Sequence, residues 1–249
     1  MHALLLVVVG LWCFLTALMG GLVGLVLGNI RLPVLVLAAS SPAAGAGANI
    51  GVSAVAALAA AVAHIRAGRI DWRLFAWMAP PSVIGAVVGG LLSGVVPGND
   101  LLVVIGVTLL VFGIDLLRPK AGGRHAGPGR VSARAAILSG ALIGLLGGFV
   151  GLILGALRLP ALLRFVGSDP ARAVGTNAAV GFCLGVGGVF GHLREGVDWW
   201  LLVVGAATSV PGAILGARLT GRLDERQLLR AIGLVLLVAG SAMILQGLA

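Results

Sequence analysis

The sequence predicts an all-α polytopic membrane protein of about eight transmembrane helices, arranged as two homologous four-helix halves. Composition, the lengths of the charge-free segments and an internal repeat support this prediction. Of the 249 residues, 59% are hydrophobic and only 10% are charged, whereas a soluble domain carries about a quarter charged residues. Such a chain has too few polar groups to cover a globule in water. Cytosolic enzymes, disordered chains and secreted disulfide scaffolds are therefore excluded.

The charge balance fits the same class of protein. Lysine and arginine number 17 against 8 acidic residues, a net charge of +9. The basic residues lie between apolar runs and form no continuous patch, so we expect loop arginines that face lipid head groups and no nucleic-acid partner. Cys13 and Cys183 both lie inside apolar stretches, where buried apolar side chains are expected rather than a disulfide. No metal site and no cofactor are expected.

The charge-free segments set the expected spans. A bilayer core about 30 Å thick needs about 20 apolar residues in a helix. The fourth segment is expected to continue to Leu117, because Asp115 falls at its end, and the first is too long for a cleaved signal peptide. The segments cover residues 3–30, 32–63, 74–99, 101–114, 135–157, 173–193, 199–217 and 231–249.

An internal repeat divides the chain into two halves. The motif Gly28-Asn-Ile-Arg31-Leu-Pro33 recurs as Gly155-Ala-Leu-Arg158-Leu-Pro160. A first transmembrane repeat is expected at 1–117, a basic cytoplasmic linker at 118–134 and a second repeat at 135–249. Internal duplication is typical of secondary transporters, whose substrate site lies where the repeats meet, although channels also show it. Further landmarks recur at nearly the same spacing: Asn49 and Asn177, His64 and His192, Gly85 and Gly212, Gly106 and Gly233.

The relative orientation of the halves is open at this point. Four full spans in each half would make the repeats parallel, and we take eight full spans as the working prediction. That arrangement places Arg66, Arg69 and the linker inside, as the positive-inside rule requires, but leaves the arginines of the second half outside. A re-entrant crossing near residues 31–41 would make the repeats inverted and bring those arginines inside.

Arg31 and Arg158 are the first candidate site residues, each two positions before a proline. Proline cannot continue a helix and disfavours helical geometry at the preceding residue, so a broken helix with an arginine at the break is expected in each half. Polar backbone at membrane depth is tolerated only where it is buried in protein or lines a cavity. A guanidinium there suits an oxyanion. The alternative is an arginine at a helix end whose side chain reaches the interface.

Asn49, Thr176 and Asn177 complete the predicted substrate-binding set. They lie near the starts of the spans that follow the two breaks, and asparagine and threonine are good helix N-caps. A helix N-terminus offers free N–H groups to an anion, although simple capping without a substrate is equally open. No catalytic residue is expected, since Ser53 has no paired base. The histidine pair is expected to mark a structural turn, with His64 at the end of a helix.

The second half carries the sharpest motifs: Gly151-Leu-Ile-Leu-Gly155, Gly175-Thr176-Asn177, Gly191-His192 and Pro211-Gly-Ala-Ile-Leu-Gly216. With these residues the chain resembles the sulfite exporter TauE/SafE family of bacterial membrane permeases over essentially its whole length. The family has a glycine triplet before the proline, where this chain has Leu27-Gly28-Asn29 and Leu154-Gly155-Ala156. The resemblance implies transport of sulfite or another small sulfur-containing anion, coupled to an ion gradient.

The predicted function is that of a secondary transporter, which moves a small anion across the bacterial inner membrane by alternating access. Its expected partners are that anion, a proton or sodium ion as coupling ion, and the lipid bilayer, and the sequence is compatible with a homodimer. An anion channel is the alternative, and an intramembrane enzyme is less favoured.

Overall fold

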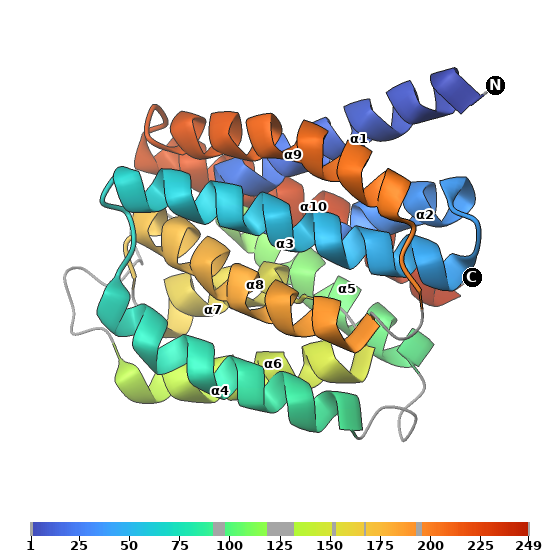
Figure 1. The fold of residues 1–249 in the computed structure, drawn as a ribbon. Coiled ribbons are helices and arrows are strands. Elements are labelled where there is room, and N and C mark those ends of the chain that lie inside the picture. Colours follow the sequence, from blue (N-terminus) through green and yellow to red (C-terminus); the bar gives the residue numbers. More distant parts are fainter. Residues whose placement is uncertain are drawn as a thin grey trace.

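The computed structural model describes residues 2–91, 98–118, 132–150, 153–166, 168–192 and 196–248, which form helices and no strand (Figure 1). Five helices, α1, α3, α5, α9 and α10, are long and apolar enough to cross a membrane. The all-helical membrane class is confirmed, while the count of eight spans stays a prediction. The helices are α1 (His2–Val23), α2 (Gly28–Ala38), α3 (Pro42–Arg66), α4 (Trp72–Leu91), α5 (Gly98–Leu117), α6 (Ala133–Val150), α7 (Gly155–Ala161), α8 (Pro170–His192), α9 (Trp199–Thr220) and α10 (Glu225–Leu248), and a π-helical segment, Leu162–Val166, follows α7.

The predicted turn after His64 forms in the first half. Helix α3 ends at Arg66, and Gly68 has a φ of +66°, a left-handed conformation that glycine adopts without strain. Asp71 then caps α4, since its Oδ1 accepts a hydrogen bond of 2.9 Å from the N–H of Leu74. In the second half α8 ends at His192, and the rest of that turn includes residues outside the described part of the chain.

Two helix pairs join the halves side by side in the same direction. Helix α1 packs along α9, and α4 packs along α6. A Cβ built on Gly10 would contact Thr208, and one built on Gly212 would collide with the Phe14 carbonyl, so α1 and α9 run parallel. Helices α4 and α6 are also parallel by the same kind of contact. Small residues allow this close approach, as is usual between helices in lipid.

Two further pairs run in opposite directions. Helix α3 packs against α8, and α5 packs against α10. A Cβ built on Gly175 would contact His64, whereas one built on Gly185, further along α8, would contact Ala54, earlier in α3. The α5–α10 pair is antiparallel by the same criterion. Thus α3 and α8, which hold matching parts of the sequence repeat, run in opposite directions.

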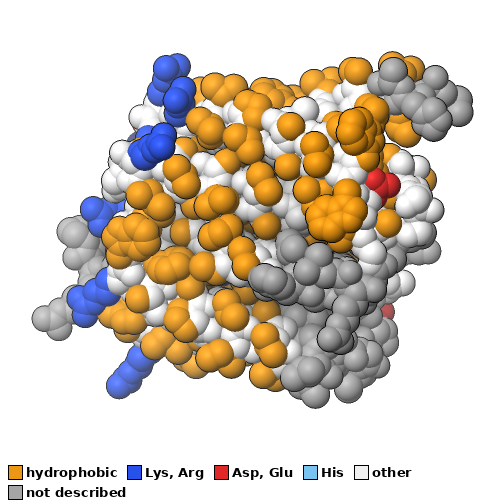
Figure 2. Space-filling model, in the orientation of Figure 1, with side chains coloured by type: hydrophobic (Ala, Val, Ile, Leu, Met, Phe, Trp, Pro, Cys, Tyr) orange, Lys and Arg blue, Asp and Glu red, His pale blue; other side chains and the backbone are white. Residues whose placement is uncertain are grey.

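Arginines gather at one end of the bundle, which we call the basic end. Figure 2 shows hydrophobic side chains over the visible face and Lys and Arg along one edge. Contacts between helix ends show that arginines from both halves of the sequence lie at this end. Arg69 Nη1 donates to the Ala217 carbonyl at 2.6 Å, and Arg164 forms an ion pair with Asp115. The arginines near these helix ends are Arg66, Arg69, Arg73, Arg118, Arg134, Arg164, Arg172, Arg218, Arg222, Arg226 and Arg230.

Candidate functional site

The first helix break lies just before α2. Helix α1 ends at Val23, residues 24–27 are not helical, and α2 begins at Gly28. Gly24 has a φ of +67°, and a Cβ at this position would collide with the Val174 carbonyl. Only glycine therefore fits there without strain. The predicted break exists, but it precedes Arg31, which lies in the first turn of α2.

Proline does not cause this break, contrary to the reasoning from sequence. Pro33 lies inside α2 and offers no N–H to the carbonyl of Asn29, one turn earlier. The Nε2 of Gln246 in α10 donates to that carbonyl at 2.9 Å. The carbonyl that proline leaves unpaired in the helix is thus satisfied by a side chain from the other half of the sequence.

The second half has a matching break. Residues 153–154 are not helical, α7 begins at Gly155, and Pro160 lies inside α7 just before the π-helical segment. In Figure 1, α2 and α7 extend toward opposite ends of the bundle, with α7 toward the basic end. The two breaks meet at Asn177, whose Nδ2 donates to Gly24 O at 2.9 Å and to Gly155 O at 3.0 Å.

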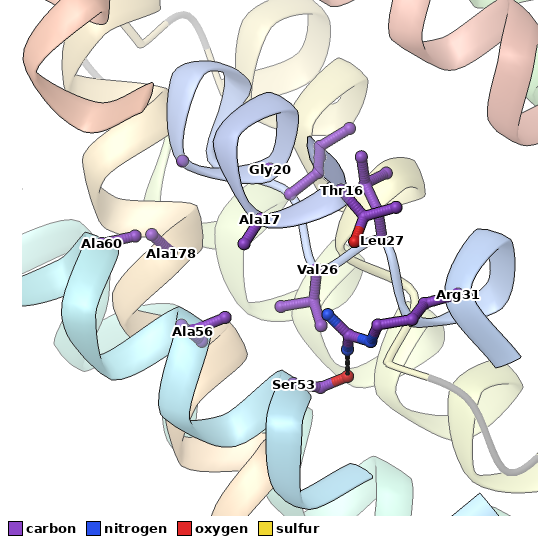
Figure 3. Close-up of a pocket in the computed structure, with 13 residues that line it drawn as sticks. Thr16, Ala17, Gly20, Val26, Leu27, Arg31, Ser53, Ala56, Ala60 and Ala178 are labelled. Carbon is purple, nitrogen blue, oxygen red and sulfur yellow. Dashed lines mark hydrogen bonds between the residues drawn. The ribbon is translucent and has the colours of Figure 1, made fainter. Parts of the chain in front are cut away.

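Arg31 is buried and fully engaged with α3. Its side chain is 2% exposed. Its Nε donates to Asn49 Oδ1 at 3.0 Å, and its Nη2 donates to the Asn49 carbonyl at 3.3 Å. The same Nη2 also donates to Ser53 Oγ, a contact visible in Figure 3. Asn49 Nδ2 in turn donates to Gly28 O at 3.0 Å. These bonds hold α2 on α3 through neutral acceptors.

Arg158, the counterpart of Arg31, is buried without such partners. It is 0% exposed, and its Nε, Nη1 and Nη2 have no hydrogen-bond partner within the described residues. Asn177 Oδ1 is likewise buried and unpaired within that part of the chain. Neither buried arginine reaches the protein surface, so the interfacial alternative for these side chains is wrong.

Three nitrogen atoms converge in front of Gly155. A Cβ built on Gly155 would lie 3.5 Å from Asn177 Nδ2, 3.6 Å from Val26 N and 4.0 Å from Arg158 Nη2, with no other heavy atom nearer than these outside its own turn. Asn177 Nδ2 already donates to two carbonyls, whereas the Arg158 guanidinium has no acceptor within the described residues. A buried guanidinium with unused donors suits an anion. We call Gly155, Val26, Arg158 and Asn177 the anion cradle.

The predicted capping roles of Asn49, Thr176 and Asn177 are wrong. Ser41 caps α3, and Asp169 accepts from the Arg172 N–H at the start of α8 at 3.0 Å. Prolines follow both caps, and proline is favoured at the first helical position. The three predicted residues therefore lie about two turns further along. Thr176 Oγ1 accepts from the Asp71 N–H at 3.1 Å, so it holds the α3–α4 turn.

Two small cavities flank the first break. One is bounded by Thr16, Arg31, Ser53 and Ala178 (Figure 3), and the other lies between Ser53 and Leu154 of the second break. Each leaves about 20 Å³ for the centre of a water-sized sphere, which is room for about one water molecule. Among the described residues, the space beside the first break therefore has room for little more than a water molecule.

The sequence reasoning missed two parts of this site. It treated Ser53 only as an unpaired hydroxyl, although Ser53 binds the Arg31 guanidinium, and it did not consider Val26 N. The sequence does carry a signal for Ser53: four residues after the matched asparagines, the first repeat has Ser53 where the second has a glycine. Nothing in the sequence indicates which backbone N–H groups are left open by a break.

The model of the sulfite exporter TauE/SafE family matches residues 9–243 of the chain. The chain belongs to the sulfite exporter TauE/SafE family. This TauE/SafE protein is 26% identical over 281 residues to "Probable membrane transporter protein YunE" of Bacillus subtilis, covering 100% of this chain and 99% of the relative. It is 28% identical over 198 residues to a "Probable membrane transporter protein" of Xylella fastidiosa, covering 76% of each chain. No solved structure was found to match. Membership of a membrane transporter family, predicted from the motifs, is confirmed.

Proposed function

We propose that this TauE/SafE protein is a secondary transporter that carries a small oxyanion, sulfite or an organosulfur anion, across the bacterial inner membrane by alternating access. The observation that carries the proposal is the Arg158 guanidinium, which is buried and has no hydrogen-bond partner within the described residues. An arginine keeps its charge in proteins. A bound anion would supply the missing counter-charge.

The electrostatics of the site favour an anion over a cation or a neutral solute. A charged side chain at the centre of a membrane helix costs about 2.5–3.5 kcal/mol on insertion scales, and a buried charge without a partner is strongly unfavourable. Among the described residues, the only ion pair joins Arg164 and Asp115. Arg31 and Arg158 therefore bring two positive charges to the site with no carboxylate paired to either.

The helix directions support an inverted repeat, in which residues 1–117 and 135–249 are related through the linker at 118–134. Helices α3 and α8 correspond in the repeat and run antiparallel, as do α5 and α10. The α1–α9 pair corresponds to the α4–α6 pair, and both are parallel. In this scheme α2 and α7 are half-crossings, and the longer helices α1, α3, α4, α5, α6, α8, α9 and α10 form the eight spans.

This scheme also supports an orientation in the membrane. Arginines of both halves lie at the basic end, and the positive-inside rule places that end in the cytoplasm. The working arrangement of parallel repeats leaves the second-half arginines outside, so we replace it with inverted repeats. The extra crossing is supplied by α2, which covers most of residues 31–41, and by α7.

Alternating access is supported by the closed state of the site. The two breaks meet at Asn177, and the cavities beside them admit about one water each. An oxyanion therefore enters only when the helices around the breaks separate on one side. Such gating around a midplane site is typical of carriers built from repeats. The mechanism we propose includes a proton or sodium ion as coupling ion.

The test is the flux of radiolabelled sulfite into proteoliposomes. Saturable uptake should be lost in Arg158→Gln and retained in Arg164→Gln, which makes the same substitution at the basic end. Uphill accumulation driven by an ion gradient would distinguish a carrier from an anion channel. If Arg158→Gln takes up sulfite as fast as wild type, the assignment of the site is refuted.

A further inference from the structure

The two halves differ at the residue four positions after the matched asparagines. Asn49 is followed by Ser53, and Asn177 is followed by Gly181. Both asparagines donate from Nδ2 to the first residue of the short helix, Gly28 or Gly155, so the two halves share this hydrogen bond. At this position one half has a hydroxyl and the other has none.

The Ser53 hydroxyl fills the space in front of Gly28. A Cβ built on Gly28 would lie 2.9 Å from Ser53 Oγ, whereas one built on Gly155 would have no neighbour closer than 3.5 Å. Ser53 Oγ accepts from the Arg31 guanidinium and donates to the Asn49 carbonyl at 2.7 Å. The serine oxygen thus lies against both Gly28 and Arg31, whereas Gly181, at the matching position near Arg158, has no hydroxyl.

The hydrogen-bonding states of the two arginines also differ, and the Ser53 hydroxyl is one of the acceptors that only Arg31 has. Arg31 donates to three acceptor atoms, from Asn49 and Ser53. Arg158 donates to none within the described residues. Hydrogen bonds from a guanidinium are charge-assisted, so an oxygen that satisfies Arg31 competes directly with any anion for the same N–H groups.

We propose that Ser53 is a built-in substitute for an anion oxygen, which closes the Arg31 half of the site and limits the protein to one oxyanion, held at Arg158. Arg31 is then a positioning residue that fixes α2 on α3. This inference rests on the proposed function. Its test therefore measures two things: whether the protein binds sulfite at all, and how many sulfite ions each chain binds. In this proposal the Ser53 hydroxyl decides which half binds the anion. The arginines do not decide it, because both halves have one.

The experiment counts labelled sulfite bound per chain at saturation in the purified, detergent-solubilised full chain. Wild type should bind one sulfite. Ser53→Ala removes the hydroxyl but keeps its Cβ, so the variant should bind two. A capacity that remains at one in Ser53→Ala would overturn the inference and leave the proposed function standing, whereas no binding by wild type would overturn the proposed function itself.

A reciprocal pair of variants guards against misfolding of Ser53→Ala. Gly181→Ser places a hydroxyl in the second half, and Gly181→Ala adds only the Cβ, which would lie 3.0 Å from Val26 Cγ2 in both variants. Sulfite affinity of Gly181→Ser should fall at least about tenfold below that of Gly181→Ala, the loss expected when charge-assisted hydrogen bonds are already occupied. Equal affinities in the two variants would overturn the inference.

Discussion

Gly155→Ala should separate anion binding from stability. Position 155 is the first residue of α7 and has no positive φ. The new methyl group would lie 3.5–4.0 Å from its nearest neighbours, an ordinary van der Waals distance. The fold therefore accepts the substitution, and the free energy of unfolding should stay within about 1 kcal/mol of wild type. The methyl would lie 3.6 Å from Val26 N and 4.0 Å from Arg158 Nη2, so it would take space beside the guanidinium.

The expected loss of affinity follows from the blocked contacts. An oxyanion displaced from this point loses at least one charge-assisted hydrogen bond, and such bonds contribute about 1.5–3 kcal/mol. Sulfite should therefore bind roughly 10- to 100-fold more weakly to Gly155→Ala. Isothermal titration calorimetry in detergent measures this affinity, and a thermal melt of the same sample measures stability.

The matching position in the first half provides the control. A Cβ on Gly28 would lie 2.9 Å from Ser53 Oγ, so Gly28→Ala forces that hydroxyl to move. Its melting temperature should drop further than that of Gly155→Ala. If Gly155→Ala folds normally and binds sulfite as tightly as wild type, the space in front of Gly155 is not where the anion sits, and the reasoning about the anion cradle fails.

Three other substitutions test the framework around the site. Gln246→Ala should lower the free energy of unfolding by about 1–2 kcal/mol. The loss should be clearly smaller in a Pro33→Ala background, because the restored N–H of residue 33 can bond to the Asn29 carbonyl. Equal losses in both backgrounds would contradict the role of Gln246. Asn177→Ala removes the hydrogen bonds to Gly24 O and Gly155 O and should cost about 1–3 kcal/mol, measured by denaturant titration in micelles. Gly144→Val pushes a side chain into the backbone of α4, where even a Cβ collides, and should cost at least about 2 kcal/mol, seen as a lower melting temperature.

The sequence was a good guide to class and a partial guide to the site. Low charge and long apolar segments predict helices in lipid because no other arrangement satisfies the backbone there. The Arg-Leu-Pro motifs correctly pointed to helix breaks, but the cause lay elsewhere. Gly24 makes the first break through its left-handed backbone, and Pro33 is tolerated because Gln246, far along the chain, satisfies the exposed carbonyl. A local pattern cannot predict a partner that only the fold supplies.

The errors about Asn49 and Asn177 have a similar origin. Sequence proximity to a break suggested capping, yet Ser41 and Asp169 lie directly before the prolines that start these helices and take that role. The asparagines act instead through their Nδ2 groups on carbonyls of the broken segments. Their common place in the repeat was visible from the sequence, whereas their partners depended on how α2 and α7 fold back.

The parallel packing of α1 on α9 and of α4 on α6 means that neither half is a self-sufficient unit. A single repeat would leave two glycine-faced helices with no neighbour to receive them. If the repeats are inverted as proposed above, an ancestor with one copy of the repeat would have needed a second molecule inserted upside down beside it, a dual-topology dimer. In the proposed scheme, fusing the two copies through a linker would fix this antiparallel arrangement in one chain. It also frees each half to diverge, and Ser53 opposite Gly181 is one such divergence.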